Sequence, residues 1–130
     1  MRRLIPIIAA VLSLSVPPLF AASSGAWMKH VPAKEQVRAD PYAKDANAAA
    51  AGAILYQRSC ASCHGDDAAG IGRHPSLRSG RVHSATDGQL FWLLTNGELA
   101  HGMPSWSRLP EGERWQLVRY LHSLPLDAKR

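Results

Sequence analysis

The hexapeptide CASCHG at residues 60–65 contains both cysteines of the 130-residue chain and places a histidine directly after the second one. Two cysteines at this spacing occur in four kinds of site: a disulfide, half of a zinc site, a dithiol redox centre and a covalently attached haem. Each kind of site needs different partners elsewhere in the chain, so the remaining sequence has to distinguish them.

Little in the rest of the sequence supports a dithiol redox centre or a zinc site. A thioredoxin-like centre needs strands joined by crossover helices, and the sequence has no alternating strand pattern. Zinc needs about four Cys, His or carboxylate ligands, yet the other histidines form no His-x-His or His-x(3–5)-His pair. These histidines are His30, His74, His83, His101 and His122. A disulfide stays open, because an exported protein can oxidise its cysteines.

A covalent haem accounts for every residue of the motif. Cys60 and Cys63 would form thioethers with the two vinyl groups, whose separation matches a spacing of about one helical turn. His64 would supply the proximal ligand of the iron, and Gly65 would let the chain turn away close to the porphyrin edge. We therefore expect one haem c per chain, bound through the two cysteines, with iron held by His64.

A six-coordinate iron needs a second axial ligand, and Met103 is the strongest candidate. Met1 begins the chain and Met28 lies in a polar N-terminal segment, whereas Met103 lies in the loop AHGMPSW at residues 100–106, outside any expected helix. The glycine before it gives this loop freedom, and the proline after it makes the loop stiffer. His101, two residues earlier, is the rival ligand.

The chain begins with the features of a secretory signal peptide. Arg2 and Arg3 form a positive region, residues 4–20 are uncharged and largely apolar, and small residues follow at 21–26. This order is typical of a cleaved signal, and a proline-containing run of this length is short for a membrane span, which needs about 20 residues. We expect residues 1–24 to be a signal peptide that directs export to the periplasm, with a retained membrane anchor as the alternative.

The remaining chain is long enough for one small domain. Roughly 105 residues follow the signal peptide, which allows a modest core. The formal net charge of +5 falls by two to +3 without Arg2 and Arg3. No Lys/Arg tract is present, so we expect no binding to nucleic acid. Residues 25–44 are polar and aperiodic, which predicts an extended N-terminal arm ahead of a domain at residues 45–130.

Three helices are predicted in this domain, at about residues 46–59, 87–96 and 110–124. Gly52 interrupts the alanine-rich pattern of the first helix and indicates a close crossing with another helix. Thr86 and Gln89 form a capping box at the start of the second helix. Pro110 fits the first turn of the third helix, and Pro125 ends it. Long loops rich in Gly, Pro and Arg separate the helices, so the predicted fold class is all-α.

Taken in order, these segments resemble a class I cytochrome c of the small bacterial periplasmic type. GAILYQRSCASCHG at residues 52–65 is similar to the first helix and haem-attachment motif of that family, and GRHPSL at residues 72–77 to its Gly-x-x-Pro-x-Leu loop. GQLFWLLTNG and HGMPSW resemble its distal half, and RWQLVRYLHSL its C-terminal helix. The resemblance implies a class I cytochrome c fold, in which three or more helices and long loops surround one covalently bound haem.

The resemblance also implies roles for individual residues. Pro75 would accept a hydrogen bond from the ring N–H of His64, which would fix the orientation of this ligand. Leu77 would pack against the haem, and Trp106 would form part of the pocket wall. The expected cofactor-binding residues are Cys60, Cys63, His64, Pro75, Leu77 and Met103, of which His64 and Met103 would hold the iron.

The same resemblance gives a reason for Gly52. It places Gly52 and Tyr56 where the first helix crosses the last one, near Tyr120 and Leu121. A glycine at this position would let the two helices approach closely.

One-electron transfer is the function that these features imply. Methionine ligation and an apolar haem environment both raise the reduction potential. No paired carboxylates or Ser/His/Asp set is present to make or break bonds, so we expect no enzymatic activity of the protein alone. We expect a monomer whose redox partners are a periplasmic dehydrogenase or quinol-oxidising donor and an oxidase acceptor.

Two other functions remain open. The chain could be a fixed electron-transfer subunit of a dehydrogenase or oxidase complex, with membrane contact only if the N-terminal segment is retained. It could also be a ligand-binding haem protein, which would need an open iron position.

Five arginines could form a basic rim for partners, and one or two of them could instead hold the haem propionates. They are Arg58, Arg73, Arg78, Arg81 and Arg108.

Overall fold

A computed structural model of the protein describes residues 25–128, so the expected signal peptide lies outside the described residues. The described part is helical and has no strand longer than an isolated bridge. Its elements are η1 (Ala26–His30), α1 (Ala33–Gln36), α2 (Ala48–Ser59), α3 (Ala61–His64), α4 (Gly80–Ser84), α5 (Asp87–Asn96), η2 (Leu99–His101) and α6 (Glu111–Ser123). The predicted all-α fold class is confirmed.

The three predicted helices are present as α2, α5 and α6. At the start of α5, Thr86 N donates to Gln89 Oε1 over 2.9 Å and Gln89 N donates to Thr86 Oγ1 over 3.2 Å, which completes the predicted capping box. Pro110 does not lie in the first turn of α6. It precedes the helix by one position and is its N-cap residue, with an extended ψ of 147°.

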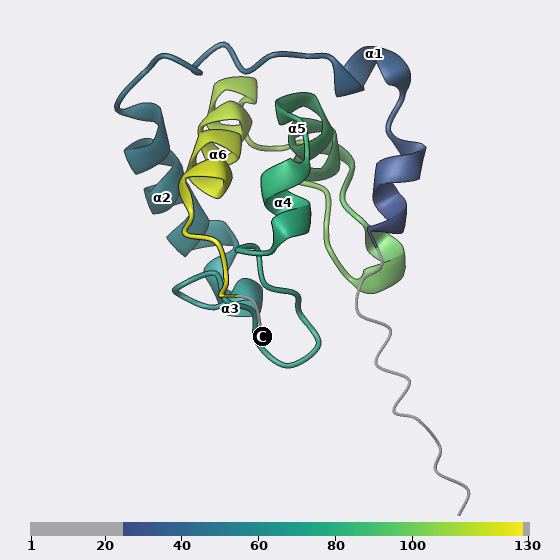
Figure 1. Ribbon diagram of the computed structural model, residues 1–130, viewed down its shortest axis with the longest axis vertical. Helices are drawn as coiled ribbons and strands as arrows, with labels where there is room; N and C mark the ends of the chain where they lie inside the picture. The colour runs from purple at the N-terminus through teal and green to yellow at the C-terminus, as the bar shows by residue number, and fades with distance from the viewer. Residues whose placement is uncertain (1–24, 129–130) are drawn as a thin grey trace, which may run out of the picture.

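Helix α2 packs side by side with α6 (Figure 1), and Gly52 lies at their crossing. A Cβ atom at Gly52 would overlap the backbone carbonyl of Gln116 and would lie 2.8 Å from Cβ of Tyr120. The ring of Tyr56 is fully buried and lies 5.1 Å from the ring of Tyr120. The predicted crossing and the reason for its glycine are therefore confirmed.

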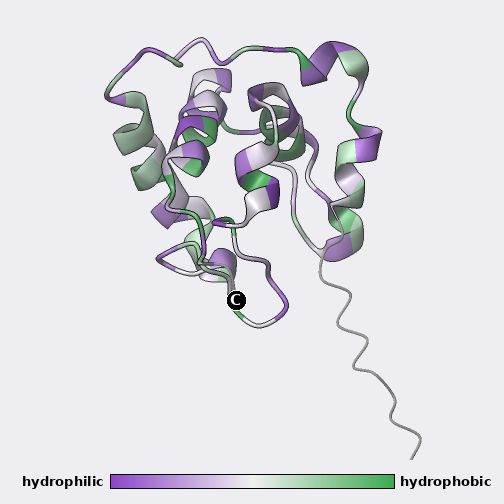
Figure 2. Cartoon of the chain, in the orientation of Figure 1, coloured by the Kyte–Doolittle hydropathy of each residue, from purple (hydrophilic) through white to green (hydrophobic). Residues whose placement is uncertain are grey.

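The core continues from this crossing to α5. Phe91 of α5 stacks on Trp115 of α6 with ring centroids 3.9 Å apart and an angle of 17° between the ring planes. Figure 2 shows apolar residues on α4, α5 and α6 in the middle of the molecule. The most deeply buried large side chains are Tyr56, Leu90, Trp115, Leu117 and Val118.

The N-terminal segment at residues 26–42, which we call the strap, is not extended as predicted. It forms η1 and α1, and it buries Trp27 and Val31 in the core. The strap passes along the outside of the fold and then over the ends of α5 and α6 (Figure 1). Its two helices have only five and four residues, so they contain no periodic pattern for sequence reasoning to detect.

Polar contacts fasten the end of the strap to α5 and α6. The buried Asp40 donates its backbone N–H to Asp87 Oδ2 over 3.3 Å, and its Oδ2 lies 3.9 Å from Arg119 Nε. His122 Nε2 lies 3.1 Å from the same Asp87 side chain. Burial raises the pKa of Asp40 and lowers the pKa of His122, because it disfavours the charged form of each group.

Replacing Gly52 with alanine should lower the free energy of unfolding by about 1–3 kcal/mol, since the added methyl group meets backbone atoms that cannot move away alone. Thermal and denaturant unfolding of the haem-loaded protein, followed by circular dichroism, would measure the loss. Gly80→Ala is the matched control, because a Cβ there would meet nothing within 4 Å. Equal stabilities for the two variants would contradict the close crossing.

Replacing His122 with asparagine should make stability less sensitive to acid. The folded state lowers the pKa of His122 below 6.5, so its contribution to stability is present above that pH and is lost as the pH falls through the folded pKa. The melting temperature of the variant should therefore drop less than that of the parent between about pH 7.5 and about pH 5.5. The exposed His30 provides the control: a His30→Asn variant that is equally acid-resistant would contradict this assignment.

Candidate functional site

The cysteine motif occupies the junction between α2 and α3. Cys60 ends α2, and Cys63 and His64 lie in the single turn of α3. Gly65 then has φ 86° and ψ 152°, a backbone conformation that side chains with a Cβ rarely adopt. The chain therefore leaves the helix directly after the histidine, as expected.

Cys60 and Cys63 form no disulfide; Cys60 is half-buried and Cys63 is exposed. Burial raises the pKa of the Cys60 thiol to about 11, with a further contribution from Cys63. Within residues 25–128 no group of three or more Cys, His, Asp or Glu side chains could hold a metal ion, so the zinc alternative lacks ligands there.

His64 is oriented by the loop that follows the motif. Its Nδ1 lies 2.9 Å from the carbonyl oxygen of Pro75, so the hydrogen bond implied by the resemblance is present. With Nδ1–H as the donor, Nε2 keeps its lone pair, which is the form that binds a metal. Burial lowers the pKa of His64 and so favours the neutral ring that ligation requires.

Tyr56 contributes a hydrogen bond that the sequence analysis missed. Its hydroxyl donates to the carbonyl oxygen of the buried Gly65 over 2.5 Å. Burial raises the pKa of Tyr56, so the hydroxyl stays protonated and remains a donor. A buried tyrosine usually needs a hydrogen-bond partner, so the sequence could have predicted that the Tyr56 hydroxyl donates a hydrogen bond. It could not have predicted which carbonyl accepts it.

The loop between α3 and α4 is held by backbone hydrogen bonds. Gly70 N donates to His64 O over 2.8 Å, and Leu77 N donates to Ala68 O over 2.9 Å. Ala68 is fully buried and has φ 60°. Leu77 is half-buried and packs against the core, and the loop places the Pro75 carbonyl beside His64.

Met103 lies after η2 in a second fixed loop. It pairs with Glu98 through two backbone hydrogen bonds of 2.9 and 3.2 Å, and its half-buried side chain packs against the core. Trp106 N donates to Leu94 O over 2.8 Å, which ties the end of this loop to α5. The rival ligand His101 is exposed, and its Nδ1 lies 2.9 Å from Glu98 Oε1.

The arginines proposed as a basic rim differ in environment. Arg78 is half-buried, with its Nε 3.2 Å from Asp127 Oδ1 and its Nη1 3.7 Å from Asp67 Oδ2. Two carboxylates of the protein therefore already balance the charge of Arg78. The exposed members of the set are Arg58, Arg73, Arg81 and Arg108.

These residues fit a covalently bound haem. The motif offers two cysteines without a disulfide and a neutral imidazole whose Nδ1 is hydrogen-bonded. Met103 comes from a different segment of the chain. Several large apolar side chains stay partly exposed although they pack against the core, as expected where a flat apolar group would cover them. They are Leu77, Val82, Leu93, Met103 and Trp106.

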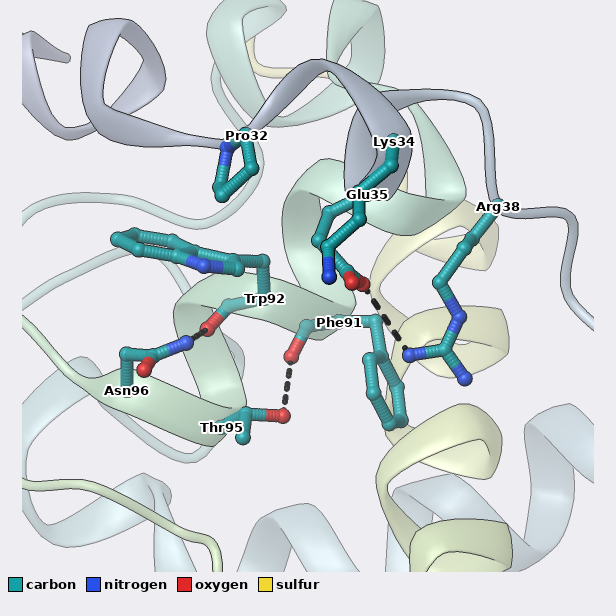
Figure 3. Close-up of a pocket in the computed structure, with 8 residues that line it drawn as sticks. All are labelled: Pro32, Lys34, Glu35, Arg38, Phe91, Trp92, Thr95 and Asn96. Atoms are coloured by element: carbon teal, nitrogen blue, oxygen red, sulfur yellow. Dashed lines mark hydrogen bonds and ion pairs between the residues drawn. The ribbon is translucent and has the colours of Figure 1, made fainter.

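A separate cavity of about 330 Å³ lies between α1 and α5 (Figure 3). It contains none of the motif residues and not Met103. Its lining is Pro32, Lys34, Glu35, Arg38, Phe91, Trp92, Thr95 and Asn96. The Arg38 guanidinium is not available to a ligand, since it pairs with Glu35 and Glu111 and stacks 4.6 Å from the ring centre of Phe91.

Residues 47–121 match the family model described as cytochrome c oxidase, cbb3-type, subunit III. The chain belongs to this family. It is a class I c-type cytochrome, as the motifs predicted, and its cofactor is haem c attached to cysteines. No helix among residues 25–128 of this cytochrome is long and apolar enough to cross a membrane.

Curated relatives of the cytochrome include two proteins named Cbb3-type cytochrome c oxidase subunit CcoP. The one from Azospirillum brasilense is 34% identical over 88 residues, covering 62% of this chain and 30% of the relative. The one from Azospirillum sp. (strain B510) is 34% identical over 91 residues, covering 63% of this chain and 30% of the relative. The cytochrome thus spans less than a third of the length of these relatives.

Two solved structures share the fold. Cytochrome cL from Methylophaga aminisulfidivorans MPT superimposes with a TM-score of 0.58 at 25% identity, covering 67% of this chain and 59% of that one. Cytochrome cL from Hyphomicrobium denitrificans gives a TM-score of 0.56 at 20% identity, covering 75% of this chain and 66% of that one, and supports the fold alone.

Replacing Tyr56 with phenylalanine should lower the free energy of unfolding by about 1–3 kcal/mol, because the buried carbonyl of Gly65 loses its donor. Denaturant unfolding of the haem-loaded protein is the measurement. Tyr120→Phe is the control, since it keeps the packing of the paired rings, and it should change stability less. A Tyr56→Phe protein as stable as the parent would show that this hydrogen bond is dispensable.

Proposed function

We propose that the protein is a one-electron carrier whose iron is held by His64 and Met103. Bound haem supplies the one-electron couple between ferric and ferrous iron. Cys60 and Cys63 attach it, and the carbonyl of Pro75 holds the ring of His64 in one orientation. This His64–Pro75 hydrogen bond carries the proposal, because it commits Nδ1 and leaves Nε2 as the nitrogen available to the iron.

The second ligand is assigned to Met103 rather than His101. The backbone of Met103 is fixed by its pairing with Glu98, and its side chain packs on the apolar core. The imidazole of His101 lies instead beside the carboxylate of Glu98 and is exposed. A methionine ligand favours ferrous iron and so suits a carrier of high reduction potential.

We further propose that the carrier is a periplasmic monomer without enzymatic activity of its own. It passes electrons from a periplasmic dehydrogenase or quinol-oxidising complex towards a terminal oxidase. The family match supports an oxidase as acceptor, because the family and the curated relatives are named as subunits of cytochrome c oxidases.

A fixed subunit of an oxidase complex is the second candidate. The similarity to CcoP favours it, although the match covers only 30% of that relative. Affinity purification of the tagged chain from its own membranes distinguishes the two functions. A carrier is released by salt washing and is recovered alone, whereas a subunit keeps its partner chains through the wash.

Replacing Met103 with leucine should abolish the methionine–iron charge-transfer band of the oxidised protein, lower the reduction potential and allow rapid carbon monoxide binding when reduced. Haem should stay attached through acid-acetone extraction, because both cysteines are unchanged. Met28→Leu in the strap is the matched control and should keep the band. If the unsubstituted protein lacks the band, the second ligand is His101 or the position is open, and rapid carbon monoxide binding would then identify the ligand-binding alternative.

A further inference from the structure

The C-terminal tail after α6 returns to the loop that carries Pro75. In Figure 1 the tail leaves α6 and ends beside the loop between α3 and α4. Leu124 is buried at the start of this tail, and Asp127 reaches the loop three residues later. The tail therefore brings a carboxylate to the proximal side of the motif.

Asp127 makes three contacts with the loop. Its backbone N–H donates to Arg78 O over 2.9 Å, and its Oδ1 lies 3.2 Å from Arg78 Nε. Its Oδ2 accepts a hydrogen bond of 2.5 Å from the hydroxyl of Ser76. Both carboxylate oxygens are thus occupied by groups of the same loop, one charged and one neutral.

Ser76 links these contacts to the expected haem ligand. It directly follows Pro75, whose carbonyl oxygen accepts the hydrogen bond from His64. Its hydroxyl also accepts a hydrogen bond of 3.1 Å from Arg78 N, so it is held on both sides. Pro75 is exposed, and its carbonyl shares one planar peptide unit with the N–H of Ser76, so the position of this carbonyl depends on how Ser76 is held.

We propose that Asp127 is a positioning residue, which acts through Ser76 and Arg78 to hold the Pro75 carbonyl against His64. The proposal rests on the proposed function only in taking His64 as an iron ligand. The ring N–H of a ligating histidine, when hydrogen-bonded, makes the ring a stronger donor to the metal. The tail thereby influences the iron from a residue that does not touch it.

If Asp127 and Arg78 formed only a surface ion pair, the loss of Asp127 would change global stability little. The side chains of Asp127 and Arg78 are 40% and 25% exposed, and exposed pairs of this kind contribute little to global stability. The geometric role differs, because one carboxylate joins two residues on the C-terminal side of the same carbonyl. We call the contacts of Asp127 with Ser76 and Arg78 the clamp. Loss of the clamp should therefore affect the His64–Pro75 hydrogen bond more than it affects the free energy of unfolding.

The test uses haem-loaded Asp127→Ala and Ser76→Ala variants and measures exchange of the His64 Nδ1 proton with solvent by NMR in the reduced state. Both variants should accelerate exchange about fivefold or more, the effect of weakening one hydrogen bond. The reduction potential should rise in both, since a weaker histidine donor favours ferrous iron. Ser76→Ala removes no charge, so its rise in potential cannot come from electrostatics alone.

Asp66→Ala is the matched control. Asp66 is an exposed carboxylate on the same loop, and its loss removes the same charge without touching the clamp. Unchanged exchange in both Asp127→Ala and Ser76→Ala, or equal acceleration in Asp66→Ala, would overturn the proposal. The carrier function is judged separately, from the methionine–iron band of the unsubstituted protein, so failure of one proposal can be told from failure of the other.

Discussion

The backbone contact between α2 and α6 at Gly52 is the constraint on which the site depends. A side chain there would push α2 away from Gln116 and Tyr120. Because α2 runs directly into Cys60, any such shift would move the attachment motif. The fully buried Tyr56 transmits the same constraint, since its ring packs at the crossing while its hydroxyl holds the carbonyl of Gly65.

Sequence reasoning succeeded where the signal was local. The capping box follows from Thr86 and Gln89 themselves, and Gly52 alone indicated a close crossing. The partner helix at that crossing and the contact between His64 and Pro75 came from the resemblance to class I cytochromes c. It failed on the strap, whose helical turns are too short to show a period. It also missed the clamp at Asp127, because nothing local indicates that this carboxylate meets Ser76, 51 positions earlier.

The site is assembled from segments that are each held by hydrogen bonds within the protein. The motif is held by Tyr56, the Pro75 loop by Ala68 and Asp127, and the Met103 loop by Glu98 and Leu94. A site held in this way changes little when the charge of its iron changes, which suits the proposed one-electron transfer. The family model is described as an oxidase subunit, and cytochrome cL from Methylophaga shares the fold.

The strap also has a consequence for the order of assembly. Its hydrogen bonds join Asp40 to Asp87, Gln36 to Thr86 and Arg38 to Glu111, across separations of 47, 50 and 73 residues. Contacts over such distances form late, because the closure of long loops carries an entropic cost. The partners of the strap lie on α5 and α6 and at the start of α5, so the strap can dock only once these helices have formed. We therefore expect the cysteine motif to stay accessible for haem attachment while the strap is still undocked.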